Sequence, residues 1–223
     1  MSDIVVIPAN SKRIMDDYVK FPNELYKNCH EYVPDLNIDV RNTYNPKKNP
    51  GLKFSDAQPC VAYRDGKPIG RVAAIINQHA NKTWKTKNVR FSQLDFIDDE
   101  EVSKALIEKV IEWGKERGMD TIQGPLGITD YDKEGMLLEN YDSMSAMTEY
   151  YNYPYYPKHM EALDFKKAVD WVQIRVKIPE EVPEKYARVS RLSKEMFGLH
   201  TRTLTKKEIL NGYGIEIFKL LNA

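Results

Sequence analysis

The stretch "LDFIDDEEVSKALIEK", Leu94 to Lys109, carries four consecutive acids between a strand-like run and a helix-like run. A helix N-terminus attracts anions, because free backbone N–H groups and the helix dipole point there. Carboxylates at this position admit two interpretations. They cap the helix, with Asp98 as N-cap and Glu101 completing a capping box, or they border an anion site that uses N–H groups further along the helix.

A second segment with chemical potential is "YYNYPYY", Tyr150 to Tyr156, which contains five tyrosines. Aromatic faces attract cations, so the rings can form a slot for an amine or a flat acyl group, with Tyr153 at its centre. The alternative is an irregular loop packed by its own rings, with the hydroxyl groups turned to water.

Charged residues elsewhere supply further candidates. The acids of "GITDYDKEG", Asp130, Asp132 and Glu134, can include a base that deprotonates an amine, or they can belong to a solvated loop. Arg71 lies in a β-rich run whose alternation places it on one face with Ala73 and Ile75. A charge in that setting needs a partner, either an anionic ligand or a carboxylate of the protein itself.

The composition narrows the class of protein. The chain has 223 residues, 42% hydrophobic and 30% charged, with 33 basic and 33 acidic residues, as in an ordinary globular protein without the positive field of a nucleic-acid binder. The sequence contains neither a signal-peptide core nor a membrane-spanning run, which predicts a cytoplasmic protein without a membrane partner. Cys29 and Cys60 have no metal-ligand spacing, so we expect thiols and no metal.

The elements that position these residues follow from periodicity and turn signals. A short strand at 4–7 precedes a helix capped by Ser11. Two strands meet at an Asp65-Gly66 turn, and "VRFSQLDFI" follows as a third. A helix over 99–117 and a strand, "DTIQGPL", then form a crossover that makes two strands parallel neighbours. The pattern predicts an α+β fold with a mixed, mostly antiparallel sheet flanked by helices.

The C-terminal part shows a change of character. "YYPKHMEALDF" predicts a short helix, and "KKAVDWVQIRVKI" a β-rich run that adds an edge strand. Pro179 and Pro183 mark a boundary, after which a helix, a short strand and another helix are expected. We therefore divide the chain into a domain at 1–178 and a region at 179–223, where a linker helix leads into an incomplete second unit.

Several passages together carry a family resemblance: "FPNELY", "VPDL", "KNP", "YRDGKPIGRVAAIIN", "EWGKERGMDTIQGPL" and "YPYYPKHMEALDF" with Asp170. With the order of elements, they resemble the acyl-CoA-dependent N-acyltransferase (GNAT) superfamily. Residues about 18 to 176 are similar to uncharacterised bacterial GNAT-like proteins with two such units in tandem. The resemblance implies a GNAT-like fold, acetyl-CoA or another acyl-CoA as cofactor, a small-molecule amine as acceptor, and a second GNAT-like unit or a homodimer as partner.

The resemblance also implies a cofactor site. GNAT enzymes hold the CoA pyrophosphate in a loop Q/R-x-x-G-x-G/A, and alignment on Ala105-Leu106 places Asp98 at the Q/R position, Glu101 at the first Gly and Ser103 at the last small residue. The loop is thus degenerate, and the phosphate-binding groups that remain are the backbone near Val102 and Ser103, with Lys104. The pantetheine arm is expected to pair with the strand that contains Gln93, Leu94, Asp95 and Phe96.

Catalytic residues carried over from the family are displaced. Many members use a tyrosine four residues before a Gly-Phe pair as the acid that protonates the thiolate. Here the pair reads Asp164-Phe165 and the matched position is Met160. Tyr155, Tyr156 and His159 are the nearest groups able to donate a proton, and Arg71, Asp130 and Tyr153 are candidate ligand-binding residues. The sequence predicts an N-acyltransferase-like protein, and the alternative is a non-catalytic GNAT-like module that binds a ligand or a protein.

Overall fold

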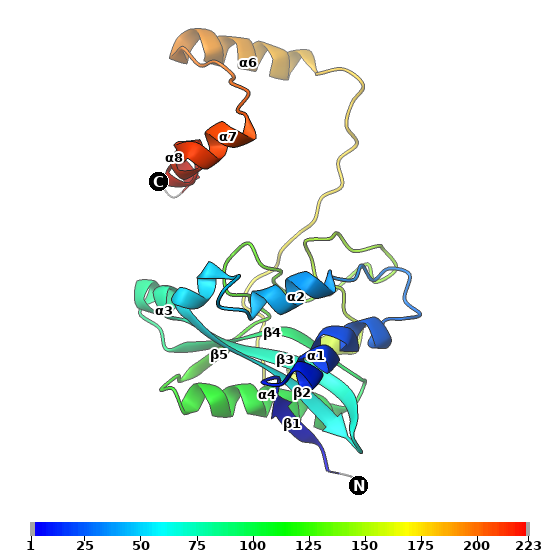
Figure 1. Ribbon diagram of the computed structural model, residues 1–223. Coiled ribbons are helices and arrows are strands. Elements are labelled where there is room, and N and C mark those ends of the chain that lie inside the picture. Colours follow the sequence, from blue (N-terminus) through cyan, green and yellow to red (C-terminus); the bar gives the residue numbers. More distant parts are fainter. Residues whose placement is uncertain (1–2, 222–223) are drawn as a thin grey trace. The chain divides into compact units, whose positions relative to one another are not determined.

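A computed structural model describes residues 3–221 of the chain (Figure 1). Contacts within the chain divide it into two compact units between Trp171 and Val172. The first unit contains the sheet and the candidate site, and the second consists of helices and connecting segments.

The first unit is built on a five-stranded sheet in the order β1-β2-β3-β4-β5. The strands are β1 (Val5–Pro8), β2 (Ser55–Arg64), β3 (Lys67–Asn77), β4 (Asn88–Phe96) and β5 (Thr121–Gln123). The first four are antiparallel neighbours, and β5 runs parallel to β4 after the crossover helix α4 (Glu100–Lys115). The predicted α+β fold with a mixed, mostly antiparallel sheet is confirmed.

The tight turn between β2 and β3 is the one that the sequence predicts. Asp65 and Gly66 have φ angles of 51° and 75°. Positive φ at both central residues gives the turn a twist that matches the flanking strands, and Asp-Gly tolerates it well. Arg64 is the last residue of β2 before this turn, and it forms an ion pair with Asp99 at the start of α4.

Helices cover both faces of the sheet (Figure 1). On one side lies α4, and on the other lie α1 (Lys12–Leu25) and α2 (Asn37–Thr43). The remaining helices of the unit are η1 (Pro50–Lys53), α3 (Gln78–Trp84) and α5 (Tyr156–Ala162). The expected cap is present at α1, where Ser11 Oγ accepts a hydrogen bond from the Ile14 N–H at 3.3 Å. Helix α1 continues through Pro22.

The two faces of the sheet have separate cores. Val72, Ala74 and Ile76 of β3 pack in the core cluster shared with α4, and Ala73 packs with Tyr18 in the cluster under α1. This is the alternation expected from the sequence, and it places Arg71 on the α1 side.

A β-bulge in β4 changes which of its side chains face α1. Ala73 pairs with Ser92 and Arg71 pairs with Asp95, so two residues of β4 lie opposite a single residue of β3. Gln93 has a φ of 46° at this point. Because the extra residue shifts the alternation, Asp95 faces the same side of the sheet as Arg71, and an ion pair can form between them.

The second unit differs from the expectation. It contains α6 (Glu184–Phe197), α7 (Lys206–Glu208), η2 (Ile209–Tyr213) and α8 (Gly214–Leu221), and the strand expected between its helices is absent from the described residues. The edge strand expected over 166–178 is absent as well. Trp171 and Ile174 are 77% and 81% exposed, because this segment has no neighbouring strand with which to form hydrogen bonds.

Within residues 3–221 no helix combines the length and the apolar character that crossing a membrane requires. Within the same residues, no three His, Cys, Asp or Glu side chains are grouped so that they could bind a metal ion.

Candidate functional site

The candidate site lies where β4 and β5 separate. Their pairing is limited to Asn88–Arg90 with Thr121–Gln123, followed by one more hydrogen bond from the Leu126 N–H to the Phe91 carbonyl at 2.9 Å. Beyond this point a cavity of about 20 Å³, room for one water molecule, lies between β4 and segments that follow β5 in the chain. Its wall contains Phe91, Leu94, Asp95, Pro125, Gly135, Met136, Tyr150, Tyr151, Asn152, Tyr156 and Met160.

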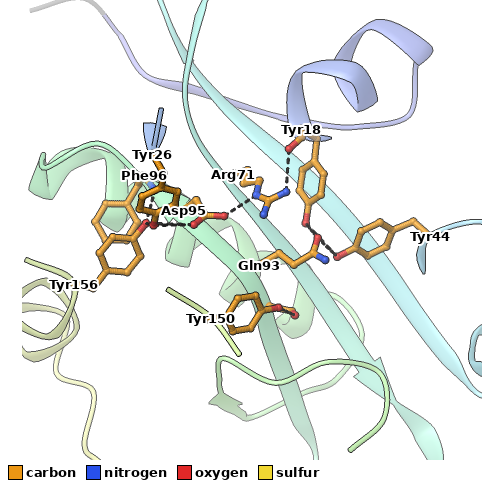
Figure 2. A network of polar contacts seen from close by, with 10 residues as sticks. Tyr18, Tyr26, Tyr44, Arg71, Gln93, Asp95, Phe96, Tyr150 and Tyr156 are labelled. Atoms are coloured by element: carbon orange, nitrogen blue, oxygen red, sulfur yellow. Dashed lines mark hydrogen bonds and ion pairs between the residues drawn. The ribbon is translucent and has the colours of Figure 1, made fainter. Parts of the chain in front are cut away.

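An ion pair between Arg71 and Asp95 is buried beside this cavity (Figure 2). Arg71 Nε donates to Asp95 Oδ2 at 2.7 Å, and Arg71 Nη1 donates to the Tyr18 carbonyl at 3.1 Å. Burial lowers the pKa of Arg71, but the charge of Asp95, the hydrogen bond to it and the neighbouring Tyr18 and Tyr32 together outweigh burial and raise the pKa. Arg71 therefore has a carboxylate of the protein itself as its partner, one of the two partners considered from the sequence.

The second oxygen of Asp95 contacts two tyrosines from distant parts of the chain. Tyr26, at the end of α1, donates to Asp95 Oδ1 at 3.1 Å, and the Tyr156 hydroxyl lies 3.4 Å from the same oxygen. The two hydroxyl groups are 2.8 Å apart. Burial is the main cause that raises the pKa of both tyrosines well above the usual value. The second cause is the neighbouring Tyr156 hydroxyl for Tyr26 and the charge of Asp95 for Tyr156. Both are therefore neutral hydrogen-bond donors at physiological pH.

The peptide groups of Phe96 are also bonded to tyrosines. The Phe96 N–H donates to the Tyr156 hydroxyl at 3.2 Å, and the Tyr155 hydroxyl donates to the Phe96 carbonyl. Burial, followed by the charge of Asp95, raises the pKa of Tyr155. The start of α5 thus satisfies the edge of β4 that the sequence interpretation assigned to the pantetheine arm.

Gln93 lies on the same face, at the centre of a further group (Figure 2). Its Oε1 accepts hydrogen bonds from Tyr18 at 2.8 Å and Tyr44 at 3.0 Å. Ser92 Oγ lies 3.3 Å from the Tyr150 hydroxyl. These contacts join α1, β4 and the tyrosine-rich segment, so the aromatic run is packed against the sheet rather than turned to water.

Ser103, His159 and Asp98 form a separate chain of polar contacts. Ser103 Oγ lies 2.8 Å from His159 Nδ1, and His159 Nε2 lies 2.9 Å from Asp98 Oδ1. Ser103 Oγ also donates to the Glu100 carbonyl at 3.1 Å. A serine, a histidine and a carboxylate in this order resemble a catalytic triad. Ser103 is only 1% exposed, however, and the nearby N–H groups of the helix are already bonded, so they cannot stabilise an oxyanion. We interpret the three residues as a structural contact that holds α4 and α5 together.

The N-terminus of α4 differs from the sequence interpretation. The N-cap is Asp99, not Asp98, and its Oδ1 accepts from the Glu101 N–H at 2.9 Å. The N–H groups of Val102 and Ser103 donate to the Asp99 carbonyl at 3.1 and 3.2 Å. Arg64 from the hairpin forms an ion pair of 2.8 Å with Asp99, whereas Asp98 contacts His159 at 2.9 Å. The donors expected to bind phosphate are therefore already satisfied.

The other predicted site residues are spread more widely. Leu94 and Val102 are buried in the core shared with α4. Lys104 is exposed and lies 3.9 Å from Glu108. Asp130 is exposed in the loop after β5, where its charge influences Arg90 and Glu134. The Tyr153 hydroxyl donates to the Leu25 carbonyl at 3.3 Å.

Two features of the site were missed from the sequence. The bulge has a visible signal, since the apolar residues of β4 that reach the α4 core are Val89, Phe91, Leu94 and Phe96, with one spacing of three among spacings of two. Tyr26 has a weaker signal, a tyrosine just beyond the end of a helix. Its partner Asp95 lies 69 residues away, a contact that no local pattern predicts.

The order of strands and the parallel final pair joined by α4 are the arrangement that the GNAT resemblance implies, and the chain has a GNAT-like fold. No family model matches the chain. Protein YghO of Escherichia coli (strain K12) is 29% identical over 167 residues, which are 73% of this chain and 43% of that protein. A bacterial ceramide synthase of Caulobacter vibrioides is 23% identical over 184 residues, which are 82% of this chain and 48% of that protein.

The chain therefore spans less than half the length of these two curated relatives. Among solved structures, a putative acetyl transferase from Pyrococcus furiosus aligns with 78% of this chain and 100% of its own, at 14% identity and a TM-score of 0.47.

Proposed function

We propose that the chain is a unit of an N-acyltransferase that transfers an acyl group from a thioester, acyl-CoA in the simplest case, to an amine. The observation that supports this most is the separation of β4 from β5: Phe96 pairs with Gly70 of β3 but has no partner residue in β5. The Phe96 N–H donates to the Tyr156 hydroxyl, and the Phe96 carbonyl accepts from the Tyr155 hydroxyl. An amide group of an extended acyl donor could replace these two hydroxyl groups, because its carbonyl can accept from the Phe96 N–H and its N–H can donate to the Phe96 carbonyl.

In this proposal the amine nitrogen attacks the thioester carbonyl, the C–S bond breaks, and the proton lost by the amine compensates the one gained by the thiolate. Tyr155 and Tyr156 are the proton donors closest to the Phe96 edge. Because the pKa of each is raised, they act as neutral donors that stabilise the leaving sulfur rather than as strong acids. His159 positions α5 through its contacts with Ser103 and Asp98.

The pyrophosphate end fits less well. The N–H groups of Glu101, Val102 and Ser103 are bonded to Asp99, and Glu100 and Glu101 add negative charge at the same place. Lys104 is the nearest cation on the helix. No step of the proposed reaction depends on a phosphate at this position. This feature favours the second candidate function, a non-catalytic GNAT-like module that binds a small ligand or a protein.

The relative named a bacterial ceramide synthase supports an amine acceptor. A ceramide is the amide of a fatty acid and a long-chain amino alcohol, so the name describes N-acylation. Because this chain spans 48% of that protein, we propose that the complete enzyme combines the unit with a second GNAT-like unit or with a second copy of the chain. Asp130 and Tyr153 remain candidates for acceptor binding in such an assembly.

Calorimetric titration with acetyl-CoA and CoA tests the proposal. We expect saturable binding, and we expect Glu100→Gln to tighten it several-fold, because like charges a few ångströms apart repel by up to several kcal/mol near a protein surface. Glu116→Gln, at the opposite end of α4, is the matched control and leaves the affinity unchanged. Absence of binding at millimolar ligand contradicts an acyl-CoA donor and favours the non-catalytic module.

A further inference from the structure

A groove of about 480 Å³ lies beside the end of α1 and the loop that leads to α2. This volume is in the range of about 300–1,000 Å³ typical of small-molecule sites. The residues that line it are Asn23, Tyr26, Lys27, Cys29, Tyr32, Pro34, Asp35, Leu36 and Asn37. The groove is separate from the small cavity beside β4, but Tyr26 joins the two, because its hydroxyl donates to Asp95 in the wall of that cavity.

One part of the groove is aromatic and aliphatic. Tyr26 and Tyr32 stack with ring centroids 4.5 Å apart, and Tyr151 meets Tyr26 edge-on at 5.7 Å. Pro34 and Leu36 extend the apolar surface outward, and Leu36 is 69% exposed. An exposed leucine that continues an aromatic wall suits an extended alkyl chain.

Next to the groove, in contact with its lining residue Cys29 but not itself in the lining, lies the carboxylate of Glu31. Cys29 Sγ, in the groove lining, donates to Glu31 Oε2 at 3.4 Å, and Glu31 is half-buried. Within residues 3–221, Glu31 takes part in no ion pair. Burial raises the pKa of Tyr151, and Cys29 and the charge of Glu31 raise it further. A half-buried carboxylate next to tyrosine rings favours an organic cation.

The surroundings of the groove have the same character. The segments 31–38 and 128–150 contain eight acidic residues and one basic residue, although the whole chain has a net charge of zero. Three contacts hold the segments together: Lys133 Nζ to Asp35 Oδ1 at 2.7 Å, and the Ser145 N–H and Oγ to the Glu31 carbonyl at 3.0 and 3.3 Å. Six exposed apolar residues lie in these segments: Leu36, Ile38, Tyr131, Leu138, Met144 and Met147.

We propose that this groove binds a cationic amphiphile, a long-chain primary amine whose ammonium group pairs with Glu31 and whose alkyl chain lies along Tyr32, Pro34 and Leu36. Negative charge and exposed apolar surface occur together here, and such a ligand satisfies both. Lys27, the basic residue of the lining, has its Nζ 4.0 Å from Glu24 Oε2. The inference rests on the proposed function, because it assigns this amine as the acyl acceptor. Tyr26 lines the groove and donates to Asp95 of β4, so it contacts both the groove and the strand.

Protection of Cys29 from alkylation tests the inference without any acyl donor. Cys29 lines the groove, and Cys60 is 3% exposed with its pKa raised by burial to about 12, so iodoacetamide at pH 8 reports on Cys29 alone. The probe is dodecylammonium below its micellar concentration. We expect it to slow the alkylation of Cys29 at least fivefold at saturation. Dodecanoate, with the same chain, and butylammonium, with the same head group, are expected to leave the rate within twofold.

Variants separate the contributions of the head group and the chain. In Glu31→Gln and in Leu36→Asn, the dodecylammonium concentration for half-maximal protection is expected to rise at least tenfold. Rates with and without ligand are compared within each variant, because Glu31 also influences the thiol. Trp84→Gln removes an apolar residue of similar exposure, 63% on α3 against 69% for Leu36, and serves as the control. A melting temperature equal to that of the parent protein verifies folding.

Three results would overturn the inference: no protection by dodecylammonium, equal protection by dodecanoate, or equal protection by butylammonium. Saturable protection in a protein that binds no acyl-CoA would support the amine site and contradict the proposed acyl transfer. Acylation of a long-chain amine that leaves Cys29 unprotected would support the proposed acyl transfer and contradict the amine site in this groove.

Discussion

The backbone N–H of Phe96 donates to the hydroxyl of Tyr156 at 3.2 Å, although 60 residues separate the two in the sequence. The same hydroxyl lies 2.8 Å from that of Tyr26. One buried oxygen atom thus connects the edge of β4, the start of α5 and the end of α1. Its removal affects three elements at once.

Tyr156→Phe is expected to lower the free energy of unfolding by about 1–3 kcal/mol, because the Phe96 N–H and the Tyr26 hydroxyl each lose a buried partner. Chemical denaturation of both proteins measures the difference. Tyr186→Phe is the control, since Tyr186 is 65% exposed and a surface substitution changes stability by less than about 0.5 kcal/mol. Equal effects of the two substitutions would show that the Tyr156 hydroxyl is not a buried hydrogen-bonding group.

The ion pair of Arg71 and Asp95 gives a second prediction. Their side chains are 3% and 11% exposed, so Arg71→Met leaves a buried carboxylate without its cation and is expected to destabilise the protein by about 3–5 kcal/mol. Asp95→Leu leaves the opposite charge and has a similar cost. The double variant removes both charges and is expected to be more stable than either single variant. Additive effects in this double-mutant cycle would contradict the direct pairing.

How far the sequence predicts this site depends on the range of each interaction. The strands, the Asp65-Gly66 turn and the placement of Arg71 follow from alternation and turn chemistry, which are local. Four consecutive acids leave the N-cap undetermined. Arg64, 35 residues before Asp99, and His159, 61 residues after Asp98, decide it. Such contacts exist only after the sheet and α5 have assembled.

The same distinction explains the segment 166–178. Its alternation of apolar and polar residues is typical of a strand, but a strand requires a neighbour for its backbone hydrogen bonds. The described chain supplies no such neighbour, and Trp171 and Ile174 remain exposed. The local alternation therefore predicts a strand, but it carries no information about whether a neighbouring strand is available to pair with it.

Asp99 gives a prediction about pH. Burial alone would raise its pKa, but the hydrogen bonds from Arg64 and from the Glu101 N–H outweigh burial and lower the pKa. The folded protein thus binds a proton here less readily than the unfolded chain. The stabilisation is complete above the unfolded pKa, near 3.9, and is lost as the pH falls through the lower pKa of the folded state.

Two substitutions separate the contributions of Asp99. Asp99→Ala removes both the cap and the ion pair, and is expected to cost about 1–2 kcal/mol at pH 7, whereas Asp99→Asn retains a good N-cap and costs less. In both variants, stability is expected to fall less steeply than in the parent protein between about pH 4 and 2. Urea denaturation at a series of pH values measures this. Parallel pH profiles for parent and variants would show that Asp99 has the same pKa in both states.

The first residues of the second unit give the last prediction. Residues 172–178 have no regular secondary structure, and Trp171, Arg175 and Lys177 offer cleavage sites to chymotrypsin and trypsin there. Exposed backbone without hydrogen-bonded partners is cut first, so brief digestion is expected to release a fragment that ends near Trp171 and keeps the circular dichroism of the sheet. Trp84, 63% exposed but within α3, is expected to resist chymotrypsin under the same conditions. Protection of 171–178, with cleavage elsewhere first, would show that this segment pairs with a partner in solution, as a strand added to the edge of the sheet would.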